Sequence, residues 1–133
     1  MQISTRAFVQ TGDNAMIGGL IVQGTEPKRV IIRAIGPKLI RFGVPDVLAD
    51  PILELHESTG VLIASNDSWL HTIIGGIITS DQGLEIRQSG HAPGNPLESA
   101  VIADLPPGNY TAIVRGVNNT MGVALAEVYD LGE

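Results

Sequence analysis

The sequence predicts an all-β protein, an antiparallel β-sandwich of the jelly-roll type with about eight strands. Its 16 glycines and 8 prolines fall largely between short apolar runs, which is where an all-β chain places its turns. Several runs alternate apolar and polar residues, as strands with one buried face do. Runs of about six to nine residues joined by connections of about two to five residues are typical of a sandwich or a barrel.

Local signals place the strands, their turns and one helical segment. TGDN at 11–14 supplies a turn, and STG at 58–60 joins two alternating runs as a hairpin. Pro37 at a first helical position and Gly43 just past the end favour one short helical turn over 37–43. The expected strands, in chain order, are 2–9, 15–24, 28–36, 51–57, 61–66, 97–105, 109–117 and 121–131.

The second strand contains the pair Gly18–Gly19, which suggests a β-bulge or the close approach of another backbone. Residues 70–96 then interrupt the strand pattern. Within them TIIGGIITS is apolar, uncharged and free of proline, so an exposed strand of this kind would be adhesive. The following SDQGLEIRQSG predicts a short helix capped by Ser80 and ending before Gly90. An insertion with so little pattern is usually a lid, a packing arm or an assembly surface.

Composition limits the number of domains and the classes of partner. A length of 133 residues suits one domain over 1–133, and an apolar fraction of 44% is enough for a core. The formal net charge of −6 argues against a nucleic-acid partner, because phosphate binding needs clustered Lys and Arg. No run approaches the roughly 18 apolar residues of a membrane span. The N-terminus has no signal-peptide pattern. With no Cys in the chain, the redox compartment stays open.

The sequence carries no recognisable catalytic motif. His56, His71 and His91 have no HxxxH or HxH spacing, and neither a G-x-S-x-G nor a Gly-rich phosphate-binding loop is present. Among 14 carboxylates nothing singles out the pair that glycoside hydrolysis needs. We therefore expect a protein that is not an enzyme.

The segment SNDSW at 65–69 comes closest to a binding site. Asn and Asp fill turns because their side chains bond to the nearby backbone, so the first interpretation is a turn that closes a hairpin. Their oxygens also suit calcium, and the candidate ligands are Asn66, Asp67 and Asp50. Trp69 is the candidate contact for a sugar ring, with a plug at the edge of the sandwich as the other interpretation. Apart from calcium, no cofactor is expected.

Three stretches, 4–39, 50–69 and 98–131, together resemble a β-sandwich module that large secreted bacterial proteins carry in repeats or at the C-terminus. The second half is also similar, more loosely, to the bacterial pre-peptidase C-terminal domain. The similarity lies in an SxG turn, an xLxASND strand end and a PGxYTxxVxG strand. The resemblance implies an extracytoplasmic, non-enzymatic sandwich that accompanies other domains. Family members with acidic loop residues bind calcium, and Asn66 and Asp67 match that part of the pattern.

We therefore expect an extracellular or cell-surface β-sandwich with a structural or adhesive role, self-assembling into a homo-oligomer or polymer through strand or arm exchange. The candidate assembly surface is the apolar arm at 72–79, with Ile73, Ile74, Ile77 and Ile78, together with the terminal strands. Replacing Ile74 and Ile77 with Asp should then abolish assembly and leave a folded monomer. The alternative is a carbohydrate-binding or calcium-stabilised accessory module of a secreted protein.

Overall fold

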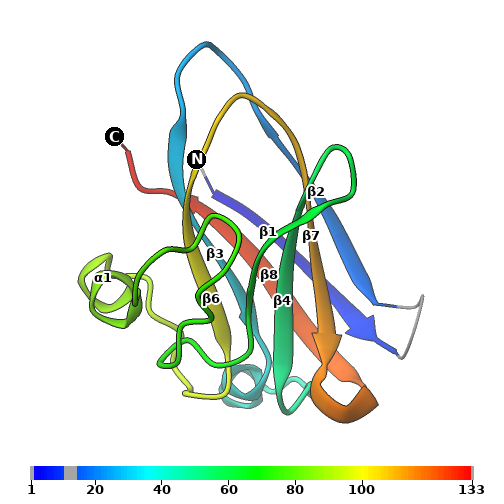
Figure 1. Ribbon diagram of the computed structural model, residues 1–133. Coiled ribbons are helices and arrows are strands. Elements are labelled where there is room, and N and C mark those ends of the chain that lie inside the picture. Colours follow the sequence, from blue (N-terminus) through cyan, green and yellow to red (C-terminus); the bar gives the residue numbers. More distant parts are fainter. Residues whose placement is uncertain (1, 11–14, 133) are drawn as a thin grey trace.

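Eight strands form two four-stranded antiparallel sheets that pack face to face, and this confirms the predicted β-sandwich (Figure 1). The computed structural model describes residues 2–10 and 15–132, so the turn expected at 11–14 lies outside the described residues. The strands are β1 Gln2–Val9, β2 Met16–Val22, β3 Lys28–Ile35, β4 Pro51–Glu57, β5 Leu62–Asn66, β6 Ser99–Leu105, β7 Gly108–Gly116 and β8 Gly122–Asp130. The helical segments are the 3-10 helices η2 Pro37–Phe42 and η3 Val117–Asn119 and the α-helix α1 Gly83–Gln88.

The strand order is that of a jelly roll. Sheet A reads β1-β8-β3-β6 and sheet B reads β2-β7-β4-β5. Strand 1 pairs with 8, 2 with 7, 3 with 6 and 4 with 5, all antiparallel. These four pairs are what results when the chain folds as one long hairpin about the turn at 58–60 and the double ribbon is then rolled up. Consecutive strands therefore lie in different sheets until the central hairpin of β4 and β5.

The main core lies between the two sheets and consists of alternate residues of the strands. Val30 and Ile32 on β3, and Leu53 and Leu55 on β4, are fully buried. Burying a side chain of this size contributes about 1.5–3 kcal/mol, so such positions hold the sheets together. None of the helices in 2–10 and 15–132 is long and apolar enough to cross a membrane.

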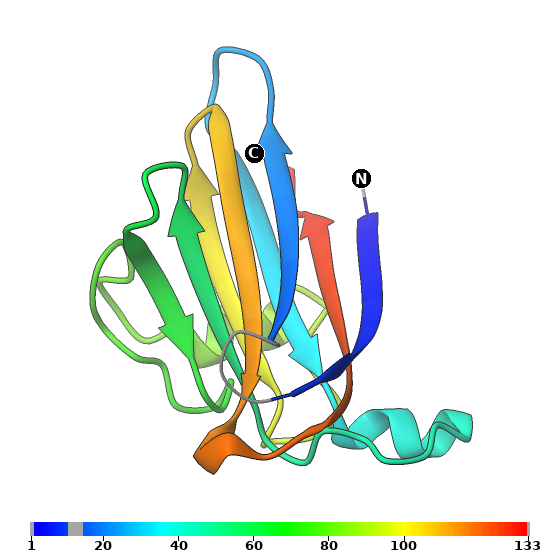
Figure 2. The same ribbon diagram turned by 90° about the vertical axis from the view of Figure 1, so that its right-hand side faces the viewer.

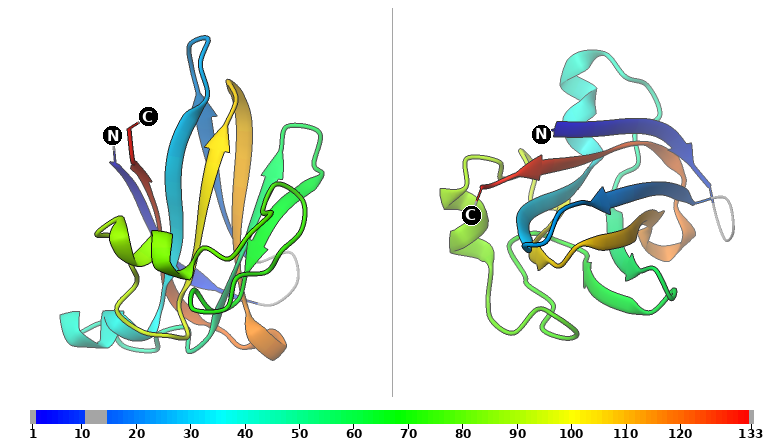
Figure 3. Two further views of the ribbon diagram at one scale, coloured as in Figure 1. Left: turned by 60° about the vertical axis from the view of Figure 1, so that its left-hand side comes forward. Right: turned by 90° about the horizontal axis from the view of Figure 1, so that it is seen from above.

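The part of the insertion that contains α1 forms a third layer on the outer face of sheet A (Figure 3). Ile86 of α1 and the neighbouring Trp69 pack on Ile31, Ala100 and Ile102. The sequence predicts this short helix correctly, but the predicted cap at Ser80 is wrong, because α1 starts after Gln82 and no side chain caps it. Its apolar face, not a capping residue, therefore fixes its position.

The insertion also protects the free edges of β5 and β6, which lie on the same side of the sandwich. The Gln82 side-chain amide donates to the Ile102 carbonyl at 2.8 Å and accepts from the Ile102 N–H at 3.0 Å. The Ala100 N–H donates to Asn66 Oδ1 at 3.2 Å. On β5, the Ile63 carbonyl accepts from the Ile77 N–H at 2.9 Å. These contacts occupy backbone groups that an added strand would need.

Candidate functional site

The start of β4 and the end of β5 bring Asp50 and Asp67 together. Leu53 pairs with Asn66 across the two strands, so the residues just outside the pair meet at the same end of the sheet. One carboxylate oxygen of each, Oδ1, is buried and has no hydrogen-bond partner. Burial and the negative charge of Asp67 raise the pKa of Asp50 from its ordinary 3.8 to about 6. Two adjacent carboxyl groups in this state favour either a shared proton or a bound cation.

Asn66, the third predicted calcium ligand, has a structural position. Its side chain is buried, and both ends of its amide bond to backbone, Oδ1 to the Ala100 N–H and Nδ2 to the His71 carbonyl. No group of three or more His, Cys, Asp or Glu residues that could hold a metal occurs in the described part of the chain. The candidate cation site is therefore the Asp50–Asp67 pair alone.

SNDSW does not close the hairpin of β4 and β5, although a tight turn does begin in it, where the His71 N–H donates to the Ser68 carbonyl at 2.9 Å. The hairpin turn lies at 58–60, where the Gly60 N–H donates to the Glu57 carbonyl at 2.8 Å. Residues 66–69 instead carry the chain from β5 in sheet B toward sheet A, where the Trp69 N–H donates to the Glu98 carbonyl at 2.9 Å. This polar segment is therefore part of the connection between the two sheets.

Trp69 lies in the layer between α1 and sheet A. Its side chain is only 7% exposed, and the Arg87 guanidinium lies 5.5 Å from the centre of its ring. A ring in this position is a plug and offers no open face on which a sugar could stack.

The apolar arm (residues 72–79) is fixed to its own sheet. Ile78 is 3% exposed and belongs to the main core, whereas Ile73, Ile74 and Ile77 remain 44%, 64% and 43% exposed. A Cβ at Gly76, whose φ is +55°, would overlap the backbone of Ile63 in β5. The structure thus places three of the four predicted assembly residues on the surface and one in the interior.

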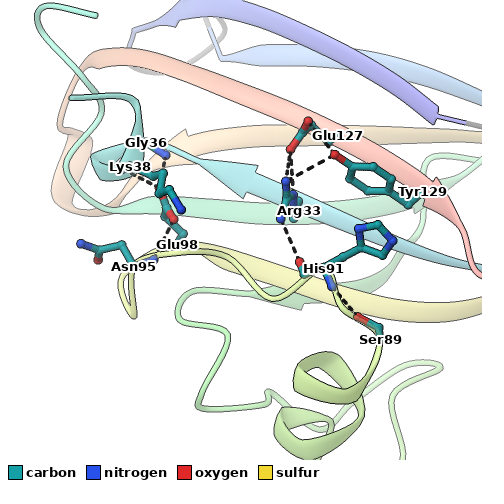
Figure 4. A network of polar contacts seen from close by, with 9 residues as sticks. All are labelled: Arg33, Gly36, Lys38, Ser89, His91, Asn95, Glu98, Glu127 and Tyr129. Carbon is teal, nitrogen blue, oxygen red and sulfur yellow. Dashed lines mark hydrogen bonds and ion pairs between the residues drawn. The ribbon is translucent and has the colours of Figure 1, made fainter. Parts of the chain in front are cut away.

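A buried carboxylate that the sequence analysis missed joins two segments of the chain. Glu98 is fully buried, and its carboxylate accepts hydrogen bonds from the N–H groups of Gly36, Lys38 and Asn95 at 2.9, 2.9 and 3.0 Å (Figure 4). The first two donors lie at the start of η2, so Glu98 ties that helix to the strand β6. All three donors are backbone groups. Those of Gly36 and Lys38 lie 62 and 60 residues away in the sequence, and that of Asn95 lies in the adjacent turn, so no sequence motif indicates the first two.

A second polar cluster attaches the insertion to sheet A. Arg33 on β3 bonds to Glu127 on β8 at 2.7 Å and donates to the His91 carbonyl at 2.9 Å (Figure 4). The Tyr129 hydroxyl donates to Glu127 at 3.0 Å, and the His91 ring stacks on the Tyr129 ring with centroids 4.1 Å apart. Because Arg33 and Glu127 neutralise each other where they are largely buried, this cluster is structural.

Large apolar side chains are exposed at several other places besides the arm, two of which are β2 and the surface between β1 and η2. On β2, Ile17 and Ile21 are 61% and 63% exposed. Phe8 and Phe42, the two phenylalanines of the chain, line a shallow hollow of about 410 Å³ between β1 and η2. The two phenylalanines share this hollow with the charged residues Arg6 and Asp46.

Comparison with known proteins shows which solved structures have a similar fold. No protein-family model and no curated protein matches the sequence. Among solved structures, the chain is similar to the pre-peptidase C-terminal domain of a collagenase from Bacillus anthracis. That match has 14% identity and a TM-score of 0.51, covering 97% of this chain and 90% of the other. A serine protease of Aeromonas sobria matches at 12% identity, over 100% of this chain and 27% of its own, with a TM-score of 0.35.

The collagenase match confirms the fold-level resemblance that the sequence predicted. Its identity is low, so it shows the same kind of β-sandwich and does not transfer any site. The serine-protease match, of which this chain spans about a quarter, has too low a TM-score to add to this.

Proposed function

We propose that this protein is a non-catalytic, extracellular β-sandwich module that acts by non-covalent association, in the first place with copies of itself. The observation that carries the proposal is the exposure of large apolar side chains on ordered strands and on the arm, among them Ile17, Ile21 and Ile74. Groups of exposed apolar side chains on a folded protein mark interaction surfaces, because leaving them in water is unfavourable.

The polar groups support a structural role more than a catalytic one. The Glu98 carboxylate accepts only backbone N–H groups, and Arg33 is bound to Glu127 and to a backbone carbonyl. A nucleophile paired with a base, which covalent catalysis needs, is not among these contacts. The likeness to a collagenase's pre-peptidase C-terminal domain supports an accessory role outside the cell.

Sedimentation velocity over a concentration series tests this proposal. Self-association predicts a sedimentation coefficient that rises with concentration, because mass action favours the complex. A single slow species of constant sedimentation coefficient at every concentration would contradict the proposal.

A cation-stabilised module is the second candidate, and the two unpartnered carboxylate oxygens of Asp50 and Asp67 favour it. Calcium takes carboxylate oxygens, and a bound ion would remove the repulsion between these groups. At a hundredfold excess over its Kd a ligand stabilises the folded state by about 2.7 kcal/mol. We expect calcium to raise the Tm of the wild type and not that of the Asp50→Asn/Asp67→Asn variant. Equal shifts in both proteins, or none in either, would exclude this pair as the site.

A further inference from the structure

β2 is an edge strand with an unusual surface. It lies at the margin of sheet B, paired with β7 on one side only (Figure 2). Its sequence MIGGLIV has no charge and no proline, and Ile17 and Ile21 project outward with Gly19 between them. Natural edge strands usually carry a charge, a bulge or a cover that blocks pairing with another chain. Among the described residues, no backbone group outside the sheet bonds to β2.

The two glycines of β2 have no explanation within the chain. The register with β7 runs without interruption from Met16 to Val22, so the expected bulge is not present. A Cβ added at Gly18 or Gly19 would meet nothing within 4 Å, and neither glycine needs a positive φ. Glycine weakens a strand and often marks a site where another backbone comes close. No other backbone among the described residues takes that place beside β2, which leaves the strand open to a second chain.

A sequence similar to that of β2 recurs in the arm. Residues 17–21 read IGGLI, and residues 74–78 of the arm read IGGII. In the arm, Gly76 lies directly against the backbone of Ile63, and Ile77 donates its N–H to the Ile63 carbonyl at the edge of β5. Gly19 matches Gly76 in sequence, but the two backbones differ. Gly76 lies at φ +55° in a tight turn closed by Gly75 and Ile78, whereas Gly19 lies in an extended strand. The likeness of the two segments is therefore one of sequence alone.

We propose that β2 pairs antiparallel with β2 of a second copy, about a two-fold axis at Gly19, and this rests on the self-association proposed above. In that register Ile17 lies opposite the partner's Ile21, and Gly19 lies opposite its own counterpart. Directly opposite residues point to the same face, so four isoleucines form two cross-strand pairs on the outer face of one continuous eight-stranded sheet.

A closed dimer fits better than a polymer or a foreign peptide. Head-to-tail growth needs a second open edge, but β5 and β6 are occupied by the arm, Asn66 and Gln82. β1, on the same side as β2, carries the exposed cation Arg6, which disfavours pairing. Because β2 is uncharged and complementary to itself, the same strand of a second copy can pair with its free backbone N–H and C=O groups, and no charged partner is needed.

Single cysteines test the register, because the chain has no Cys of its own. Directly opposite Cα atoms lie about 4.5–5.5 Å apart, within the range that a disulfide spans. Gly19→Cys should therefore give a disulfide-linked dimer under mild oxidation. Ile17→Cys should not link to itself, because its counterpart lies about 13 Å away along the strands. A mixture of Ile17→Cys and Ile21→Cys should link.

Ile74→Cys on the arm separates this inference from the proposed function. The β2 dimer is supported if Gly19→Cys cross-links and the mixture of Ile17→Cys and Ile21→Cys also cross-links. Ile17→Cys alone and Ile74→Cys should then stay monomeric. Cross-linking of Ile74→Cys without Gly19→Cys overturns it and moves the interface to the arm, so self-association survives. Cross-linking of none of these variants above a urea-unfolded control contradicts both proposals. Equal cross-linking of Gly19→Cys and Ile17→Cys also overturns the register.

Discussion

Glu98 is a fully buried carboxylate that accepts hydrogen bonds from three backbone N–H groups, two at the distant start of η2 and one at the nearby Asn95. Hydrogen bonds to a charged group contribute more than neutral ones, so Glu98→Gln should lower the free energy of unfolding by about 2–3 kcal/mol. Urea denaturation measures this, with Glu26→Gln on the surface as a matched control. Equal stability of the two variants would show that the Glu98 contacts do not hold η2 in place.

The stability of the protein should depend on pH through Asp50, because the pKa of this residue in the folded protein is raised to about 6. A carboxyl group with a raised pKa is protonated more readily in the folded state than in the unfolded state. Stability without added cations should therefore fall as pH rises from about 4 to about 6. Since the group is partly exposed, its contribution is about 1 kcal/mol.

The Asp50→Asn variant isolates this effect. It should be less sensitive to pH between about 4 and 6 than the wild type and more stable than it at pH 7. Urea denaturation at several pH values measures both. A wild-type stability that rises over this pH range, or a variant with an unchanged pH profile, would contradict the role of the Asp50–Asp67 pair.

The role of a single residue could be predicted from the sequence when its contacts are close in the sequence, and not when they are distant. The sequence makes Asp50 and Asp67 candidates because carboxylate oxygens suit calcium, and the pairing of β4 with β5 explains why they meet. Glu98 was missed because two of its three partners are backbone groups of the distant residues Gly36 and Lys38, which only the fold brings near it. Asn66 was taken as a ligand because an amide after a strand also fits a loop site, and only the fold reveals Ala100 as its partner.

At the level of elements, the arm depends on the close approach of Gly76 to β5. Gly76 has a φ of +55°, and any Cβ there would overlap the backbone of Ile63. Gly76→Ala should therefore destabilise the protein by about 1–3 kcal/mol. The control is Gly18→Ala, whose Cβ meets nothing within 4 Å and which should change stability by less than about 1 kcal/mol. Urea denaturation measures the stability of both variants. A larger loss of stability in Gly18→Ala than in Gly76→Ala would contradict the docking of the arm on β5.

The strands were the elements that the sequence predicted best. Alternation and turn residues place β4, β5 and their hairpin within about a residue or two of the observed ends. The insertion was less predictable, because its apolar residues divide between the core, where Ile78 lies, and the surface, where Ile74 lies. An apolar run without a period does not reveal which of its residues face the core.

At the level of the whole molecule, the jelly roll leaves the two sides of the sandwich unequal. On one side the insertion occupies the edges of β5 and β6, and on the other β2 is open (Figure 2). The formal net charge of −6 opposes association of two copies in general. An uncharged β2 is the place where this repulsion is locally weakest, and the account therefore centres on a dimer.

The most direct test is the mass in solution by light scattering, measured for the wild type and for Ile17→Lys/Ile21→Lys over the same concentration series. Both side chains are exposed in the monomer, so the variant should keep its fold by circular dichroism. The control with an equal change of charge is Ile40→Lys/Leu84→Lys, at residues 64% and 66% exposed on η2 and α1.

We expect the wild type and the control to approach twice the monomer mass of 14.0 kDa as concentration rises, and Ile17→Lys/Ile21→Lys to remain at that monomer mass. A wild type that stays monomeric at every concentration, or a dimer that persists in Ile17→Lys/Ile21→Lys, would contradict the account.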